Sequence, residues 1–104
     1  FVDINPKNLC MSEEEIVKKV NKNTLAVFMT HAQGFNGLTS KLISFLKKRK
    51  VLLIEDVSES HGATFNKRKL GTFGKISNFS FYYAHHMSTI EGGMVCTNDK
   101  GSTL

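Results

Sequence analysis

The chain contains two short apolar runs that each give way to polar side chains. Residues 24–29 are almost all apolar and rich in strand formers, and residues 51–54 repeat this pattern before Glu55 and Asp56. Uninterrupted apolar strands are typical of a parallel sheet that is buried on both faces. Further strands are predicted at residues 1–4, 76–81 and 94–97.

Helical periodicity separates these strands. Ser12 and Glu15 form a predicted capping box, and apolar residues follow at helical spacing, so residues 13–21 are expected to be helical. A second helix is predicted over residues 38–50, whose last four residues are cations that suit a helix carboxyl end. Residues 63–71 are predicted to form a small hairpin. The alternation predicts an α/β fold, with a mostly parallel sheet flanked by helices.

Composition narrows the classes of protein that remain. Hydrophobic residues make up 40% of the 104 residues and there is a single Pro, which favours a packed globular region over disorder. The net charge of +5 could attract nucleic acid, but the basic residues lie on predicted helix faces and in one turn without interleaved aromatic residues. We therefore expect no nucleic-acid partner. A phosphorylated small molecule would suit the same charge.

Cysteine usage and hydropathy favour a cytoplasmic protein. Cys10 and Cys96 are far apart and show no disulfide framework, which favours a reducing compartment. No apolar run approaches the length of a membrane span, and no signal peptide is visible, so no membrane partner is expected. The chain starts at Phe1 inside a predicted strand, so we expect it to be a piece of a longer protein.

Polar residues gather in three loops that follow predicted strands, at residues 30–31, 56–62 and 82–91. Ligands of open α/β sheets bind at the carboxyl ends of the strands, so these loops are expected to form a site. Asp56 could be a helix N-cap or a buried anion that needs a cationic partner. His85 could make ordinary loop hydrogen bonds or transfer protons near neutral pH.

Four histidines raise the question of a metal. A zinc site from His31, His61, His85 and His86 is conceivable, but their spacing matches no ligand pattern, so no metal is expected. Ser80, in the strand predicted at residues 76–81, could simply point into a packed sheet.

Five motifs occur in order along the chain. They are residues 30–34 (THAQG), 54–63 (IEDVSESHGA), 69–74 (KLGTFG), 78–82 (NFSFY) and 91–98 (EGGMVCTN). Together they resemble the VHLYG, IEDAAQAHGA, K-x-G-x-x-G, FSFY and GGAVVTN motifs of the nucleotide-sugar aminotransferase and dehydratase family. This family consists of fold-type I enzymes that depend on pyridoxal 5′-phosphate. The motifs span nearly the whole chain.

The resemblance implies a fold and an extent. The fold would be the large, cofactor-binding domain of the aspartate aminotransferase-like enzymes. Residues 1–104 would form part of that domain, about a quarter of a family member, and the rest of the large domain and a C-terminal small domain would lie outside the chain. Family members share each active site between the two subunits of a homodimer, so this piece alone would be inactive.

One position departs from the aminotransferases of the family. They carry a Lys five residues after the Ser of FSFY, and this Lys attaches the cofactor covalently. Here the position is His85, whose imidazole cannot form that bond. Sugar 3-dehydratases of the family also carry His there, and residues 85–94 are similar to their loop. The resemblance therefore implies removal of the C3 hydroxyl from GDP-4-keto-6-deoxymannose with L-glutamate as amino donor, in the pathway to GDP-colitose and O-antigen.

The resemblance also implies roles for particular residues. Asp56 would pair with the protonated pyridine nitrogen of the cofactor, Ser80 would donate to its phosphate, and Glu59 would contact the ring hydroxyl. His85 would be the sole general acid–base, while the cofactor cycles between pyridoxal and pyridoxamine 5′-phosphate. Ser58 stands where iron–sulfur relatives carry a cluster Cys, so no cluster is expected.

Two alternatives remain open. A family enzyme could use His85 in a different pyridoxal-phosphate reaction, which assays with a GDP-sugar and with an amino donor alone would separate. A non-catalytic member could have kept the fold, and would show no spectral change with the cofactor.

Overall fold

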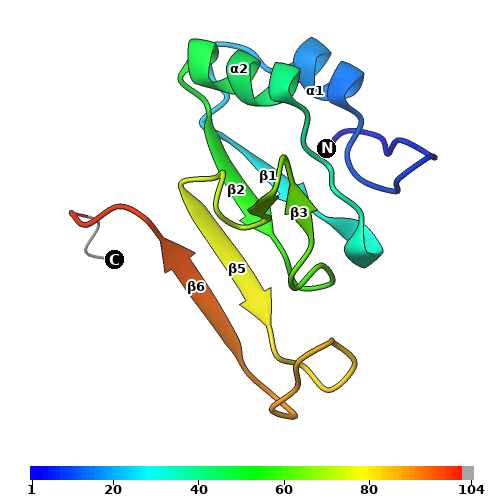
Figure 1. The fold of residues 1–104 in the computed structure, drawn as a ribbon. Helices are drawn as coiled ribbons and strands as arrows, with labels where there is room; N and C mark the ends of the chain where they lie inside the picture. The colour runs from blue at the N-terminus through cyan, green and yellow to red at the C-terminus, as the bar shows by residue number, and fades with distance from the viewer. Residues whose placement is uncertain (102–104) are drawn as a thin grey trace.

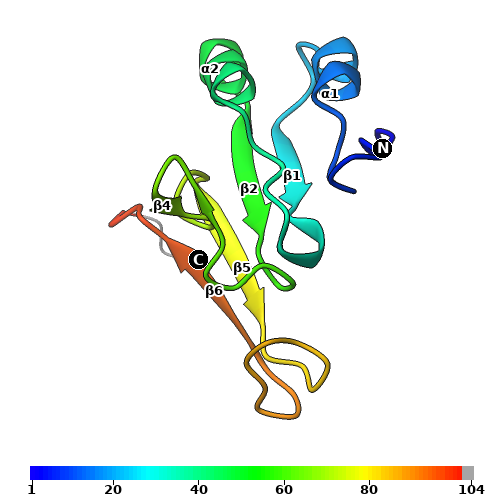
Figure 2. The same ribbon diagram turned by 45° about the vertical axis from the view of Figure 1, so that its right-hand side comes forward.

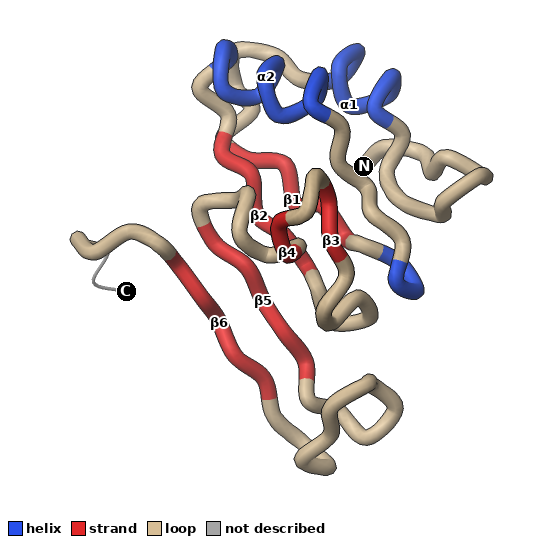
Figure 3. Tube along the Cα trace, in the orientation of Figure 1, coloured by secondary structure: helices blue, strands red, loops and turns tan. Residues whose placement is uncertain are grey.

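In the computed structural model, which describes residues 1–101, two α-helices and a four-stranded sheet form the main regular structure (Figures 1 and 3). The helices are α1 (Glu13–Lys19) and α2 (Ser40–Arg49), with a short 3₁₀ turn, η1 (Ala32–Gly34). The strands are β1 (Ala26–Thr30), β2 (Leu52–Asp56), β3 (Thr64–Phe65), β4 (Arg68–Lys69), β5 (Ile76–Ser80) and β6 (Gly93–Thr97).

The main sheet has the strand order β1-β2-β5-β6. Strands β1, β2 and β5 are parallel, whereas β6 pairs antiparallel with β5 because only the loop at 81–92 joins them. The prediction of a mostly parallel α/β sheet is thus confirmed. Both views show α1 and α2 side by side near the amino ends of β1 and β2, with the β5–β6 hairpin extending away from them (Figures 1 and 2).

The apolar core lies between the helices and one face of the sheet. Val27 and Met29 of β1 and Leu53 of β2 are buried in one cluster with Leu42 of α2. Successive side chains of a strand point to opposite faces. Phe28, between the two buried residues of β1, therefore points to the other face and is half exposed. Residues 1–101 cover one face of the sheet and leave the other open.

The helices begin and end largely as their sequences predict. The Thr39 hydroxyl accepts the Leu42 amide at 3.0 Å and caps α2, which ends at Lys50 in the left-handed region (φ 57°). The Ser12 hydroxyl accepts the Glu15 amide at 3.5 Å, but the Glu15 carboxylate turns away to Lys18. Only half of the predicted capping box therefore forms.

The predicted hairpin is confirmed as β3 and β4. Phe65 pairs with Arg68, which leaves Asn66 and Lys67 as a two-residue loop. Both loop residues have positive φ, 49° and 62°. A type I′ turn requires this conformation, because its twist matches that of the flanking strands.

The strand predicted at residues 1–4 is wrong. Ile4 makes a single antiparallel bridge with Met11, and the Asn5 amide donates to the Cys10 carbonyl at 2.8 Å. The segment folds back on itself around Pro6 and satisfies its backbone hydrogen bonds locally. It therefore does not enter the sheet.

Candidate active site

The carboxyl ends of β1, β2 and β5 carry a row of polar side chains. Thr30 is in register with Asp56, and Asp56 with Asn78. Residues paired in this way point to the same face of a sheet, and Ser80, two residues beyond Asn78, points there as well. These side chains lie on the open face, at the strand ends where the sequence placed the site.

The two oxygens of the half-buried Asp56 carboxylate have different surroundings. Oδ1 accepts the Asn78 side-chain amide at 2.9 Å and the Ser58 backbone amide at 3.1 Å. Oδ2 is contacted only by the Thr30 hydroxyl, at 3.5 Å, within residues 1–101. No helix begins after Asp56 in residues 57–101, so the N-cap interpretation does not apply. The carboxylate keeps one oxygen that can receive a cationic group.

Ser80 stands where the loop at 81–92 leaves the sheet. Its hydroxyl oxygen accepts the Tyr82 amide at 3.3 Å. Its hydroxyl hydrogen has no acceptor within residues 1–101, so it is available to an anion such as a phosphate group. The side chain is half-buried and does not point into the packed core.

Glu59 and His85 line one open pocket of about 330 Å³. The Glu59 carboxylate is held there because its Oε2 accepts the Gln33 amide at 3.0 Å. The His85 ring is half-buried, and its Nδ1 is buried without a partner in the described part of the chain. The remaining lining residues are Gln33, Ala84 and His86. The pocket thus combines a carboxylate with an imidazole that has one unpartnered ring nitrogen.

The four predicted site residues fall into two groups. Asp56 and Ser80 lie on the open face of the sheet, whereas Glu59 and His85 share the pocket beside it. Asp56 and Ser80 end β2 and β5, and Glu59 and His85 lie in the loops that follow these strands, at the carboxyl ends where the sequence predicted a site.

His61 is a half-buried neighbour of His86, one of the residues that line this pocket. Its ring centroid lies 5.7 Å from that of Phe79, 6.0 Å from that of Phe81 and 5.9 Å from that of His86. Both ring nitrogens are buried without a partner within residues 1–101. Burial lowers the pKa of His61, and the nearby His86 and His85 lower it further. The neutral form of His61 is therefore favoured over the charged form.

Sequence reasoning missed a buried network directly behind Asp56. Glu55 and His31 are both fully buried, and Glu55 Oε1 lies 3.2 Å from His31 Nε2. Glu55 also accepts the amides of Gly71 at 2.8 Å, Phe73 at 2.8 Å and Gly74 at 2.6 Å. The side chain points to the opposite face from its neighbour Asp56.

The hydrogen bonds determine the charges in this network. His31 Nδ1 accepts the Gly37 amide at 3.1 Å, so the ring proton is on Nε2 and is donated to Glu55. Burial raises the pKa of the Glu55 carboxyl, but the His31 hydrogen bond and the three amides outweigh burial and bring the pKa below its usual value. The sequence held only two signals of this network: a Glu directly after an apolar run, and a His six residues before a Gly.

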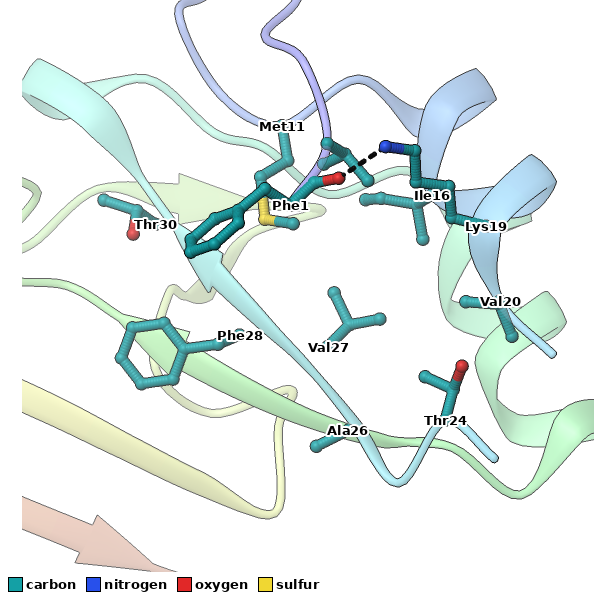
Figure 4. A pocket seen from close by; sticks show the side chains of 11 residues that line it. Phe1, Met11, Ile16, Lys19, Val20, Thr24, Ala26, Val27, Phe28 and Thr30 are labelled. Carbon is teal, nitrogen blue, oxygen red and sulfur yellow. Dashed lines mark hydrogen bonds between the residues drawn. The ribbon is translucent and has the colours of Figure 1, made fainter. Parts of the chain in front are cut away.

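Other features of residues 1–101 do not point to a further site for chemistry. This part of the chain holds no cluster of His, Cys, Asp and Glu side chains placed to bind a metal ion. A hollow of about 560 Å³ beside β1 is lined mainly by apolar residues, among them Phe1 and Phe28 (Figure 4). Lys19 donates to the Phe1 carbonyl there at 2.7 Å. No helix in residues 1–101 has the length and apolar character of a membrane span.

The fold is the α/β fold of the pyridoxal-phosphate aminotransferase-like enzymes. The chain belongs to the DegT/DnrJ/EryC1/StrS aminotransferase family, whose model matches residues 1–103. The expected fold and cofactor are thereby confirmed, because relatives of known structure hold pyridoxal 5′-phosphate.

Two relatives of similar identity to this chain have different names, one a dehydratase and one a synthase. The chain is 36% identical over 100 residues to the GDP-4-keto-6-deoxy-D-mannose 3-dehydratase of Escherichia coli O55:H7, covering 96% of this chain and 26% of that protein. It is 37% identical over 100 residues to the GDP-perosamine synthase of Escherichia coli O157:H7, covering 96% and 28%. The chain therefore spans about a quarter of the length of the relatives it matches.

Solved structures with a similar fold also include both dehydratases and aminotransferases. The E. coli GDP-4-keto-6-deoxy-D-mannose-3-dehydratase with bound hydrated pyridoxal phosphate is 38% identical, with a TM-score of 0.86 over 95% of this chain and 25% of that one. A structure of GDP-4-keto-6-deoxymannose-3-dehydratase with a trapped pyridoxal phosphate–glutamate geminal diamine is 37% identical, with a TM-score of 0.86 over 95% and 26%. An aminotransferase from Psychrobacter cryohalolentis has a TM-score of 0.90 at 31% identity, over 95% and 25%. The family is thus one of pyridoxal-phosphate enzymes that include nucleotide-sugar aminotransferases and dehydratases.

Proposed function

We propose that residues 1–104 form part of the large domain of a nucleotide-sugar 3-dehydratase. The enzyme would remove the C3 hydroxyl of GDP-4-keto-6-deoxymannose with L-glutamate as amino donor, giving a 3,6-dideoxy-4-keto sugar. The observation that carries the proposal is the imidazole of His85 at the position where aminotransferases of the family carry Lys. Its support includes the similarity to a dehydratase of this specificity and to a dehydratase structure that trapped glutamate.

The residues at the strand ends fit the cofactor. Asp56 has one oxygen, Oδ2, that can accept the pyridinium N–H, and Ser80 has a hydroxyl hydrogen for the phosphate. Glu59, held by the Gln33 amide, would orient the ring hydroxyl. When bound, pyridoxal phosphate supplies an electron sink for breaking bonds at the attached carbon atoms.

His85 would move every proton of the reaction. The imidazole would first carry a proton from the α-carbon of glutamate to the cofactor carbon, and it would later carry a proton from the aminated cofactor to the departing C3 hydroxyl. A neutral imidazole suits both steps because its usual pKa lies near 6.5. The unpartnered Nδ1 of His85 supports this role, since no hydrogen bond within residues 1–101 occupies that nitrogen. Proton transfer of this kind contributes about a hundredfold to ten-thousandfold.

The proposal extends to the setting of the enzyme. We infer a cytoplasmic homodimer with shared active sites that acts towards GDP-colitose and O-antigen. The support is the family resemblance and the free, unpaired Cys10 and Cys96. Gel filtration and a comparison of the lipopolysaccharide sugars in a strain without the gene would test these inferences.

Incubation of the full-length enzyme with pyridoxal phosphate, L-glutamate and the GDP-sugar tests the reaction. The proposal predicts that mass spectrometry finds a sugar that has lost an oxygen atom, with release of 2-oxoglutarate and ammonia. Asp56→Asn and His85→Asn should each collapse turnover, whereas Glu14→Gln, on an exposed part of α1, should not. Borohydride should not fix the cofactor to the wild-type chain.

A second function is favoured by one observation, the 37% identity to GDP-perosamine synthase. An aminotransferase would instead give a sugar in which the keto oxygen is replaced by an amino group. That product from the wild-type enzyme would refute the dehydratase proposal. An unchanged cofactor spectrum after addition of L-glutamate would indicate a non-catalytic member.

A further inference from the structure

We infer that Asn78 is a positioning residue that fixes the Asp56 carboxylate and leaves Oδ2 as the oxygen that meets the cofactor ring. This inference rests on the proposed function, because it assumes that Asp56 pairs with the ring nitrogen. It deepens that function by assigning one particular oxygen and the residue that selects it.

The two oxygens of the Asp56 carboxylate differ in how many further hydrogen bonds they can accept. Each carboxylate oxygen accepts about two hydrogen bonds in the carboxylate plane. Asp56 Oδ1 already receives the Asn78 side-chain amide at 2.9 Å and the Ser58 amide at 3.1 Å. Oδ2 has only the Thr30 hydroxyl, at the 3.5 Å limit. A new donor is therefore accommodated at Oδ2.

The orientation of the Asn78 amide is determined by its neighbours. Its Nδ2 faces two oxygens, Asp56 Oδ1 at 2.9 Å and Ser58 Oγ at 3.4 Å. The reversed amide would place its oxygen against the carboxylate and lose the hydrogen bond to Asp56. Its Oδ1 is buried and has no donor within residues 1–101, so Nδ2 alone orients the side chain.

A carboxylate needs such a contact to keep a single orientation. The last torsion of Asp is broad and roughly two-fold, so rotation is opposed only by hydrogen bonds. The Ser58 amide belongs to the turn after β2 and fixes one direction, while Asn78 approaches from the neighbouring strand β5. Two donors from different elements define the carboxylate plane, and functional groups must be held to about 0.5 Å for productive binding.

A purely structural role for Asn78 makes a different prediction. If the side chain only joined β2 to β5, its removal would lower stability without affecting the bound cofactor. If it positions Asp56, its removal would leave the protein folded but weaken the pairing between the carboxylate and the ring nitrogen. The protonation of the ring nitrogen separates these cases, and ¹⁵N NMR of ring-labelled pyridoxal phosphate reports it.

The test compares Asn78→Leu and Asn78→Ser with the wild-type full-length enzyme. We expect a weaker affinity for pyridoxal phosphate by about tenfold to a hundredfold in equilibrium dialysis, the value of one hydrogen bond to a charged group. The ring ¹⁵N signal should move towards the unprotonated form. The smaller Ser variant provides the measurement if the Leu variant does not fold. Asn23→Leu, at an exposed position, should match the wild type.

Exchanging the two partners sharpens the test. The double variant Asp56→Asn with Asn78→Asp keeps a hydrogen bond between the strands but moves the charge to β5. It should recover thermal stability without recovering the ring protonation. Unchanged affinity and an unchanged ¹⁵N signal in both single variants at Asn78 would overturn the inference. If Asp56→Asn alone also left the signal unchanged, the proposed function itself would fail.

Discussion

Replacement of Glu55 by Gln should be among the most damaging conservative changes in this chain. Each Glu55 oxygen accepts from two donors, His31 and Gly71 at Oε1 and two backbone amides at Oε2. The nitrogen of a Gln side chain would face two donors in either orientation. His31 cannot adapt by accepting at Nε2, because its Nδ1 must stay unprotonated to accept the Gly37 amide.

The magnitude follows from the bonds that are lost. Two hydrogen bonds to a buried charge disappear, and each contributes about 1.5–3 kcal/mol, so the free energy of unfolding should fall by about 3–6 kcal/mol. This is a large share of a typical stability of about 5–15 kcal/mol. The turn at 70–74 and the loop after β1 should loosen first, since both are tied to this carboxylate.

Urea unfolding followed by far-ultraviolet circular dichroism measures this change. Glu14→Gln is the matched control, because Glu14 is exposed and should change stability by less than about 1 kcal/mol. If Glu55→Gln lowered the free energy of unfolding by less than about 1 kcal/mol, the hydrogen bonds to Glu55 would contribute little to stability, which would refute this prediction.

The same carboxylate predicts an acid dependence. Its pKa in the folded chain lies below the ordinary value of 4.5, so the unfolded chain binds its proton first as the pH falls. The stability that the Glu55 carboxylate contributes is therefore fully present above pH 4.5. It is lost as the pH falls from 4.5 through the pKa of Glu55 in the folded chain. Glu55→Gln should remove this part of the acid destabilisation.

Two further changes test other parts of the structure. Gly74→Ala should lower the free energy of unfolding by about 1–3 kcal/mol, because the new Cβ would lie 2.6 Å from the Leu53 carbonyl oxygen. Urea unfolding of Gly101→Ala, where the nearest atom is 3.6 Å away, is the control, and equal losses would contradict the reasoning. His61→Phe should lose less stability than the wild type as the pH falls below 6.5, because the unfolded wild-type chain takes up a proton that the folded chain excludes. Parallel curves of melting temperature against pH would refute it.

The sequence by itself determined the elements that depend on local pattern. The apolar runs at 24–29 and 51–54 formed β1 and β2, and the hairpin, the helices and the loop at 82–91 lie near their predicted positions. Apolar periodicity and turn chemistry act over a few residues, so they can be read from the chain directly. The motif that places His85 five residues after Ser80 is of the same kind.

Only the tertiary structure decided how these elements combine. Residues 1–4 are mostly apolar and were predicted as a strand, yet the segment makes local hydrogen bonds and stays outside the sheet. The register of β1, β2 and β5 put Thr30, Asp56 and Asn78 in one row and turned Glu55 to the opposite face. The pairing of Glu55 with His31 joins residues 24 positions apart. Such contacts depend on the order of the strands in the sheet and on the face to which each side chain points. The alternation of residues within a single strand does not encode either of these.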